Sequence, residues 1–194
     1  MIPKDAEIVV GFDHAVSGRD ESVAWIGAMV KTTPLNVLVE HEVRVWLNTL
    51  VHDQVVELKG TYPYARYCID ATAEGGKEAL GECRRANLDT LGVDFSRAKQ
   101  GLMIGLKNTM QQKLIVIFDE KTLVQLKHYK FSESKTTKGR YKYGAPGTPD
   151  DRVDAVALAS YRAFLLRTYG GAESAALFVG GSTRLQESAG ITFL

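Results

Sequence analysis

The strongest constraint on this fold is a segment near the C-terminal end that is apolar on nearly every side of a helix. Ala155 to Leu166 has this character, and such a helix must be covered by other elements all round. Three acids, Asp150, Asp151 and Asp154, stand directly before or within its first turn. A carboxylate at the start of a buried helix costs free energy unless it is paired or binds a metal ion. We therefore expect a central helix over 148–168 that brings acids into the interior.

The start of this helix has the residues of a regular N-terminus. Thr148 suits the N-cap and Pro149 the first helical position. In that phase Asp151 and Asp154 lie three residues apart on one face, and Asp150 and Asp154 lie four apart. Thr148 with Asp151 is also a capping-box-like pattern, and acids in a first turn complement the helix dipole without a catalytic role. The pattern leaves both interpretations of Asp151 open.

Two further acids stand at the ends of predicted strands. Glu7 to Asp13 contains a β-branched run and predicts a buried strand that ends on Asp13. Ala65 to Ile69 predicts another strand, and Asp70 follows it. Asp13 alone could form an Asx turn and Asp70 alone could cap a helix. Rigid strands that end in acids at an open sheet edge are nevertheless typical of convergent metal ligands.

Apolar periodicity and turn residues predict the remaining elements. Strands are expected at 22–30, 36–46, 93–95 and 114–118, and helices at 47–59, 76–86, 96–111 and 120–129. Ser96 is the expected N-cap of the third of these helices. Leu47 and Leu50 are expected in the apolar stripe of the first. Three successive strands favour an antiparallel meander, and the later alternation is typical of an α/β fold. We predict one domain over 1–170, with a hairpin or loop at 128–144, and a partly disordered C-terminal tail at 171–194.

Composition limits the classes of function. The chain has 194 residues, 45% hydrophobic and 24% charged, with a formal net charge of +1. Any contact with nucleic acid must therefore come from a local basic patch. Cys68 and Cys83 have the spacing of neither a disulfide framework nor a zinc site, which indicates a reducing intracellular setting. Residues 1–10 lack a basic region followed by a long apolar run, so we do not expect a secretory signal, and no apolar stretch approaches the roughly 20 residues that span a bilayer. We expect a soluble protein without membrane contact.

Carboxylates from three sites, brought together, suit a hard divalent cation such as Mg²⁺ or Mn²⁺. Such a set can hold two ions, about 3.5–4 Å apart, which activate water and stabilise the leaving oxygen of an in-line phosphodiester displacement. This chemistry needs no nucleophilic side chain. It agrees with the four histidines, none of which has a recognisable catalytic or zinc-binding partner pattern.

The segment 128–144 is strongly basic and contains a single acid, Glu133. Its candidate DNA-binding residues are Lys130, Lys135, Lys138, Arg140 and Lys142. Such side chains can neutralise backbone phosphates, and the interleaved aromatic residues can stack on bases. An ordinary solvated hairpin is the alternative. Lys99, near the start of the 96–111 helix, is a further candidate for DNA contact, although an exposed lysine often only solubilises.

Three motifs together resemble the nuclease domain of phage-type terminase large subunits, a branch of the ribonuclease H-like superfamily. They are Val10-Gly11-Phe12-Asp13 with Gly18 and Asp20, Cys68-Ile69-Asp70 with Gly75-Gly76, and Gly147-Thr148-Pro149-Asp150-Asp151-Arg152-Val153-Asp154-Ala155. The last motif is the most specific. The resemblance implies an α/β, ribonuclease H-like fold with a central mixed β-sheet, three antiparallel strands followed by parallel strands, flanked by helices.

The resemblance also implies roles for individual residues. Asp13, Asp70 and Asp151 are the implied catalytic metal ligands, and Asp150 or Asp154 could share that role. Asp20 matches an acid that the family often carries beyond the first ligand, and it is expected to lie behind the ligands rather than to bind metal.

The implied activity is Mg²⁺- or Mn²⁺-dependent endonucleolytic cutting of concatemeric viral DNA, by two ions, during genome packaging in the host cell cytoplasm. The implied partners are double-stranded DNA, a terminase ATPase domain, the portal and the small terminase subunit. Because no helix-turn-helix or zinc finger is present, we expect little sequence specificity.

Other interpretations stay open. A whole packaging motor would carry an ATPase phosphate loop, but the run 75–78 lacks its upstream glycine and hydroxyl residue. We therefore expect either a stand-alone nuclease or a fragment of a larger protein. The short segment before the first strand favours a fragment. Rival functions are a Holliday-junction resolvase-like endonuclease, whose fold also ends in an acid-bearing helix, and a non-catalytic docking module of the packaging machinery. An actin-like or sugar-kinase ATPase lobe would need a glycine loop that residues 13–16 do not supply.

Overall fold

The computed structural model describes residues 6–15, 21–32, 36–133, 141–144 and 149–169, with the backbone alone for 131–133, 141–143 and 169. The chain divides into two compact units, residues 1–163 and 164–194. The described part of the second unit, 164–169, continues the last helix. The predicted tail at 171–194 lies outside the described residues.

A mixed six-stranded sheet, in the order β5-β4-β1-β2-β3-β6, forms the centre of the first unit. Its strands are β1 (Glu7–Asp13), β2 (Ser22–Val30), β3 (Val37–Trp46), β4 (Arg66–Asp70), β5 (Asp89–Val93) and β6 (Ile115–Val116). The first three strands pair antiparallel, whereas β4, β5 and β6 each run parallel to a neighbour. The predicted mixed sheet is confirmed.

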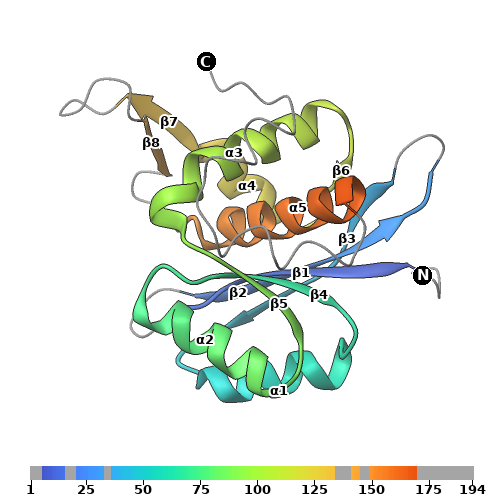
Figure 1. Cartoon of the computed structure of the whole chain (residues 1–194). Coiled ribbons are helices and arrows are strands. Elements are labelled where there is room, and N and C mark those ends of the chain that lie inside the picture. The colour runs from blue at the N-terminus through green and yellow to red at the C-terminus, as the bar shows by residue number, and fades with distance from the viewer. Residues whose placement is uncertain (1–5, 16–20, 33–35, 134–140, 145–148, 170–194) are drawn as a thin grey trace. The chain divides into compact units, whose positions relative to one another are not determined.

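Helices cover both faces of this sheet. They are α1 (Val51–Thr61), α2 (Glu74–Arg85), α3 (Phe95–Gln111), α4 (Glu120–His128) and α5 (Asp151–Tyr169). Figure 1 shows α1 and α2 on one face and α3, α4 and α5 on the other. A separate antiparallel pair, β7 (Lys130–Glu133) and β8 (Tyr141–Gly144), lies within the segment for which a hairpin or loop was expected.

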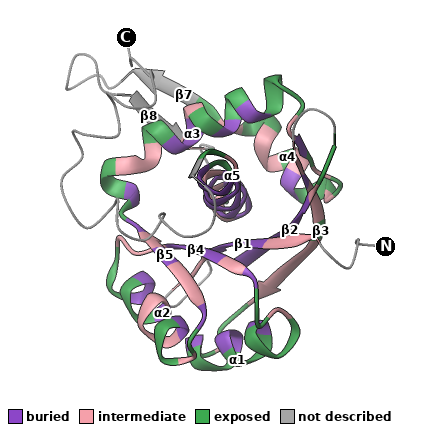
Figure 2. Cartoon of the chain, turned by 45° about the vertical axis from the view of Figure 1, so that its right-hand side comes forward, coloured by how far each residue is buried: buried purple, intermediate pink, exposed green. Residues whose placement is uncertain are grey.

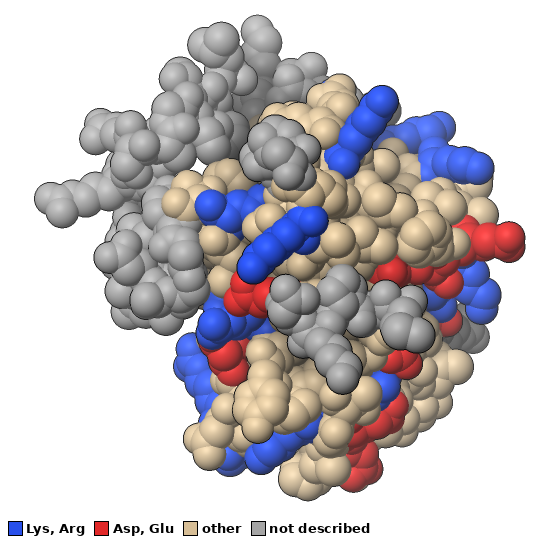
Figure 3. All heavy atoms as spheres, turned by 90° about the vertical axis from the view of Figure 1, so that its right-hand side faces the viewer, with Lys and Arg blue, Asp and Glu red and all other residues tan. Residues whose placement is uncertain are grey.

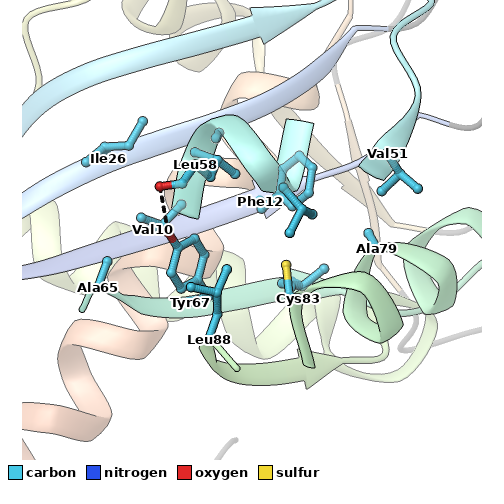
Figure 4. Close-up of a cluster of buried hydrophobic side chains, with 13 residues drawn as sticks. Val10, Phe12, Ile26, Val51, Leu58, Ala65, Tyr67, Ala79, Cys83 and Leu88 are labelled. Atoms are coloured by element: carbon cyan, nitrogen blue, oxygen red, sulfur yellow. Dashed lines mark hydrogen bonds between the residues drawn. The ribbon is translucent and has the colours of Figure 1, made fainter. Parts of the chain in front are cut away.

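Two cores sandwich the sheet. On the side of α1 and α2, apolar side chains such as Phe12, Leu58 and Tyr67 form one buried cluster (Figure 4). The Tyr67 hydroxyl donates to the Tyr62 carbonyl at 2.9 Å, so its polar end is satisfied. On the other side, α5 lies between the sheet and α3, and Ala155 to Ala159 are fully buried (Figure 2). The apolar pattern of this segment correctly predicted its central place.

The prediction that the first helix begins at Leu47 is wrong. Helix α1 begins at Val51, and Leu47 and Leu50 are 59% and 73% exposed rather than part of an apolar stripe. Strand β3 continues to Trp46, and Asn48 then adopts a positive φ of 52°. This left-handed residue forms the turn between strand and helix, so the helical phase starts later than the leucine spacing indicates.

The predicted strand at 93–95 and the predicted cap at Ser96 are also wrong. Strand β5 ends at Val93, and Asp94 is the N-cap of α3, because its side chain accepts a hydrogen bond from the Ser96 amide at 2.9 Å. Phe95 is then the first helical residue. The polar and glycine residues of 89–92 hid a strand that is fixed by pairing with β4.

Two further boundaries differ from prediction. Helix α5 begins at Asp151 rather than at Pro149, with the Asp154 amide donating to the Asp150 carbonyl at 3.0 Å. Asp150 therefore holds the N-cap position expected for Thr148, which lies outside the described residues. The strand expected at 114–118 is limited to the two residues of β6, and Phe118 beyond it is 64% exposed.

Candidate metal centre

Two of the predicted ligands end adjacent parallel strands. In the pairing of β1 with β4, Phe12 is opposite Ile69. The next residue of each strand is Asp13 and Asp70, so both acids stand at the same edge of the sheet. This register follows from the apolar segments that bury both strands, and it brings together two residues that are 57 positions apart in the sequence.

Helix α5 crosses β1 in direct backbone contact next to Asp13. A Cβ on Gly11 would lie 2.6 Å from the Ala159 amide nitrogen and still closer to the Ala155 carbonyl oxygen. Only glycine permits this approach. Because Gly11 is two residues before Asp13 on the same face of the strand, the contact directs the first turn of α5, with Asp151 and Asp154, toward the end of β1.

The start of α5 is held by Arg152, which is only 5% exposed. Its guanidinium Nη1 donates to Asp119 Oδ2 at 3.0 Å, and its backbone amide donates to Gln125 Oε1 at 3.1 Å. Asp119 is the N-cap of α4 and also accepts from the Thr122 amide at 2.7 Å. A charged, buried network of this kind fixes the beginning of one helix against the beginning of another.

The gathered acids repel one another electrostatically. Burial raises the pKa of Asp13 well above its ordinary value, and the carboxylates of Asp154, Asp70 and Asp151 raise it further. Burial likewise raises the pKa of Asp154 to about 7, although Lys99 opposes this shift. Such mutual effects require short separations in a medium of low dielectric constant. The chain thus concentrates negative charge at one edge of the sheet.

A lysine from α3 partly offsets this charge. Lys99 Nζ lies 2.8 Å from Asp154 Oδ2 and 3.4 Å from Asp150 Oδ2. Burial alone would lower the Lys99 pKa, but the two carboxylates more than offset this and hold the pKa above its usual value. Lys99 therefore belongs to the acidic cluster.

A threonine orients the Asp70 carboxylate. The Thr72 hydroxyl donates to Asp70 Oδ1 at 2.6 Å, and the Thr72 amide donates to the same oxygen at 2.9 Å. The hydroxyl in turn accepts from the Phe95 amide at 2.6 Å. Asp70 is thus tied through Thr72 to the first residue of α3, whereas the N-cap position of α2 is held by Ala73.

The donor set fits a hard divalent cation in its chemistry. Its atoms are carboxylate oxygens, and Asp154 Oδ1 is buried with no hydrogen-bond partner, which is costly unless a cation binds it. Among the residues that the structure describes, however, no group of three or more His, Cys, Asp or Glu side chains is arranged to hold a metal ion as it stands. Lys99 contacts the other oxygen of Asp154, Oδ2, at 2.8 Å.

The remaining predicted site residues have varied positions. Lys130 is exposed at the start of β7. Of Lys142 only the backbone is described, in β8, and Asp20, Lys135, Lys138 and Arg140 lie outside the described residues. The end of β8 approaches the acids, because a Cβ on Gly144 would lie 3.5 Å from Asp150 Oδ2. No helix in the described part of the chain is long and apolar enough to cross a membrane.

Comparison with solved structures identifies the fold. The large terminase nuclease from thermophilic phage G20c with bound magnesium matches with a TM-score of 0.67 and 21% identity, covering 82% of this chain and 83% of that one. The nuclease domain of the large terminase g2p from bacteriophage SPP1 with bound manganese matches with a TM-score of 0.57 and 16% identity, covering 80% and 86%. This chain has the fold of a large terminase nuclease domain.

The large terminase of bacteriophage HK97 shares the terminase nuclease fold with this chain at a TM-score of 0.56 and 11% identity. That match covers 82% of this chain and 40% of the HK97 protein. The sequence matches no protein-family model and no curated protein. The ribonuclease H-like, terminase-type architecture predicted from the three motifs is confirmed at the level of fold.

Three residues around the acids were missed or placed differently by sequence reasoning. Lys99 was expected to contact DNA, which stays a prediction, and its contact with the acids Asp150 and Asp154 was not anticipated. Thr72 gave no sequence signal beyond its place two residues after a strand-ending acid. Gly11 was noted only as part of a motif, although its combination with the small residues Ala155 and Ala159 indicates a close strand–helix crossing.

Proposed function

We propose that this chain is a divalent-metal-dependent endonuclease that hydrolyses phosphodiester bonds of double-stranded DNA, as the nuclease part of a phage packaging terminase. The observation that carries the proposal is the meeting of Asp13, Asp70, Asp151 and Asp154 at one sheet edge in a terminase nuclease fold. The solved structures of this fold with bound magnesium and manganese support the choice of cation.

In this proposal Asp13, Asp70 and Asp151 hold the cation, and Asp154 or Asp150 completes its surroundings. The bound cation supplies an activated water and stabilises the leaving oxygen of the phosphodiester. Thr72 keeps the Asp70 carboxylate in one orientation. These acids are half-buried, so their charge is screened less than that of fully exposed acids and acts more strongly on a cation bound between them. The expected pair of ions stays a prediction.

The hairpin strands offer a route for DNA to this edge. Gly144, at the end of β8, approaches Asp150 closely, and Lys130 opens β7 with an exposed side chain. In Figure 3 Lys and Arg side chains are distributed among Asp and Glu over the face shown. A local basic segment, as in the hairpin 128–144, is therefore a better candidate for phosphate contact than the whole surface.

The proposed setting is the packaging motor. We infer from the similarity to the HK97 large terminase, of which this chain matches 40%, that a terminase ATPase domain is a partner. The portal, the small terminase subunit and concatemeric viral DNA follow as partners and substrate in the same proposal.

Nicking of a supercoiled plasmid tests the activity. The wild-type chain is incubated with Mn²⁺ or Mg²⁺, with and without a chelator, beside Asp13→Asn and Asp70→Asn. Asp53→Asn is the matched control, because Asp53 is an exposed acid on α1. We expect the wild type and Asp53→Asn to nick DNA, and chelation or either site substitution to abolish nicking.

Equal activity in all four proteins would refute the proposal. Complete inactivity of the wild type with retained binding of packaging components would instead favour a docking module. A parallel assay on four-way junctions addresses the resolvase alternative: a strong preference for the junction over linear duplex would replace the terminase function with that of a resolvase.

A further inference from the structure

The Lys99 side chain is held between two acids of the cluster. Its side chain is 27% exposed and that of its partner Asp154 is 13% exposed, so their contact at 2.8 Å is largely shielded from water. The second partner, Asp150, lies 3.4 Å from the same ammonium. Exposed surface ion pairs contribute little to stability. An ammonium that is shielded from water between two carboxylates interacts with them much more strongly.

Aromatic rings complete this position. Lys99 Nζ lies 5.6 Å from the ring centroid of Phe95 and 6.0 Å from that of Tyr129. Both distances are within the range of a cation–π contact. Phe95 opens the same helix, α3, and Tyr129 directly follows α4. Two carboxylates and two aromatic rings therefore surround the Lys99 ammonium on the α5 side of the site.

This charge lies beside the oxygen that Asp154 would offer to a divalent ion. Asp154 presents one oxygen to Lys99, and its other oxygen, Oδ1, is buried without a hydrogen-bond partner. An ammonium and a divalent cation sharing one carboxylate at about 3–4 Å would repel each other strongly in this environment. Each cation therefore weakens the binding of the other at Asp154.

We propose that Lys99 is an internal counter-cation that competes with divalent metal for the Asp150–Asp154 side of the centre. The inference rests on the proposed function, because it assumes that the acids bind metal. It goes further in assigning to Lys99 an effect on the metal affinity of the acids. The consequence is an affinity for metal that is set below what the carboxylates alone would give.

Calorimetric titration of the full chain with Mn²⁺, without DNA, tests the competition. Lys99→Met removes the charge with little change in volume, and Lys99→Arg keeps the charge. Lys107→Met is the matched control, because Lys107 is an exposed lysine on the same helix. We expect Lys99→Met to bind Mn²⁺ about tenfold more tightly or to bind an additional ion. Lys99→Arg and Lys107→Met should resemble the wild type.

Unchanged or weaker Mn²⁺ binding by folded Lys99→Met would overturn the inference. If Lys99→Met does not fold, Lys99→Gln replaces it, since its amide can still donate to Asp154, and the same gain in affinity is expected. Asp13→Asn separates the two proposals. If Asp13→Asn loses Mn²⁺ binding while the Lys99 variants match the wild type, only the inference fails. If Asp13→Asn binds Mn²⁺ like the wild type, the proposed function itself fails.

Discussion

Gly11 in β1 lies against Ala155 in α5 so closely that the strand backbone touches the helix backbone with no side chain between them. Asp13 stands two residues after Gly11, and Asp154 stands one residue before Ala155. The distance between strand and helix at this crossing therefore sets the distance between their acids. A larger residue at position 11 would increase the distance between strand and helix and, with it, the distance between the acids.

Gly11→Ala should for this reason impair folding and metal binding together. The added methyl group would meet the backbone of Ala155 and Ala159, which cannot rotate away as a side chain can. Overpacking of this kind costs about 1–3 kcal/mol, and more where backbone is involved. We expect a lower free energy of unfolding in urea at an unchanged m-value, and Mn²⁺ binding weaker than in the wild type.

Gly60→Ala is the control for this substitution. A Cβ on Gly60, within α1, meets nothing within 4 Å. Alanine favours a helix over glycine by up to about 1 kcal/mol, so this variant should be as stable as the wild type or more so. Equal stability of Gly11→Ala and Gly60→Ala would show that the strand–helix approach places no demand on position 11.

The acids could be predicted from the sequence because the elements that carry them are strongly patterned. The β-branched run before Asp13 and the apolar segment after Asp154 each indicate a buried element on their own. The ends of such elements are then fixed to within a residue or two. What the pattern does not contain is the register that pairs Phe12 with Ile69, which depends on how β1 and β4 pack together.

The surroundings of the acids were less predictable for a physical reason. Lys99 meets Asp154 only because α3 crosses over α5, and nothing in the residues near position 99 encodes that crossing. Thr72 acts through hydrogen bonds to both Asp70 and Phe95, which are 25 residues apart in the sequence. The ends of buried elements are set locally, whereas contacts between elements are set by packing of the whole unit.

Asp13→Asn should stabilise the protein in the presence of a chelator, and more so as the pH rises. The folded-state pKa of Asp13 lies above its ordinary value of 3.8, so the fold favours the protonated form, which asparagine mimics. A carboxyl with a raised pKa contributes full stability below its unfolded pKa and loses it as the pH rises through the folded value. For Asp154, whose pKa is about 7, that window runs from 3.8 to about 7.

Thermal unfolding from pH 5 to pH 8 measures this effect. The melting temperature of Asp13→Asn should exceed that of the wild type by a margin that grows with pH, whereas exposed Asp53→Asn should show no such trend. Saturating Mn²⁺ should reverse the order, because only the wild type gains stability from the bound ion. A margin that shrinks with rising pH would mean that Asp13 carries no repulsive charge in the fold.

Thr72→Val should weaken metal binding without removing any ligand. The substitution deletes the hydroxyl that donates to Asp70 Oδ1 and leaves the Phe95 amide without its acceptor. Loss of such an orienting contact typically lowers metal affinity about 10- to 100-fold. We expect this loss in a Mn²⁺ titration, with recovery to near wild-type affinity in Thr72→Ser. If the Thr72→Val and Thr72→Ser variants bind Mn²⁺ with equal affinity, Thr72 does not orient Asp70.

Substitutions in the hairpin should change the salt dependence of DNA binding rather than the metal affinity. Lys130 is exposed on β7, and the paired strand β8 ends beside Asp150, so a duplex engaged at the acids would pass close to this segment. Each lysine that neutralises a phosphate contributes about 0.9 to the slope of log affinity against log salt concentration. Lys130→Ala should therefore reduce the slope for duplex DNA by about one, while calorimetric Mn²⁺ binding stays at the wild-type value.

Lys59→Ala is the control, because Lys59 is an exposed lysine of α1 on the opposite face of the sheet, and this variant should leave the slope unchanged. Equal slopes for Lys130→Ala and Lys59→Ala would remove Lys130 from the path of the DNA.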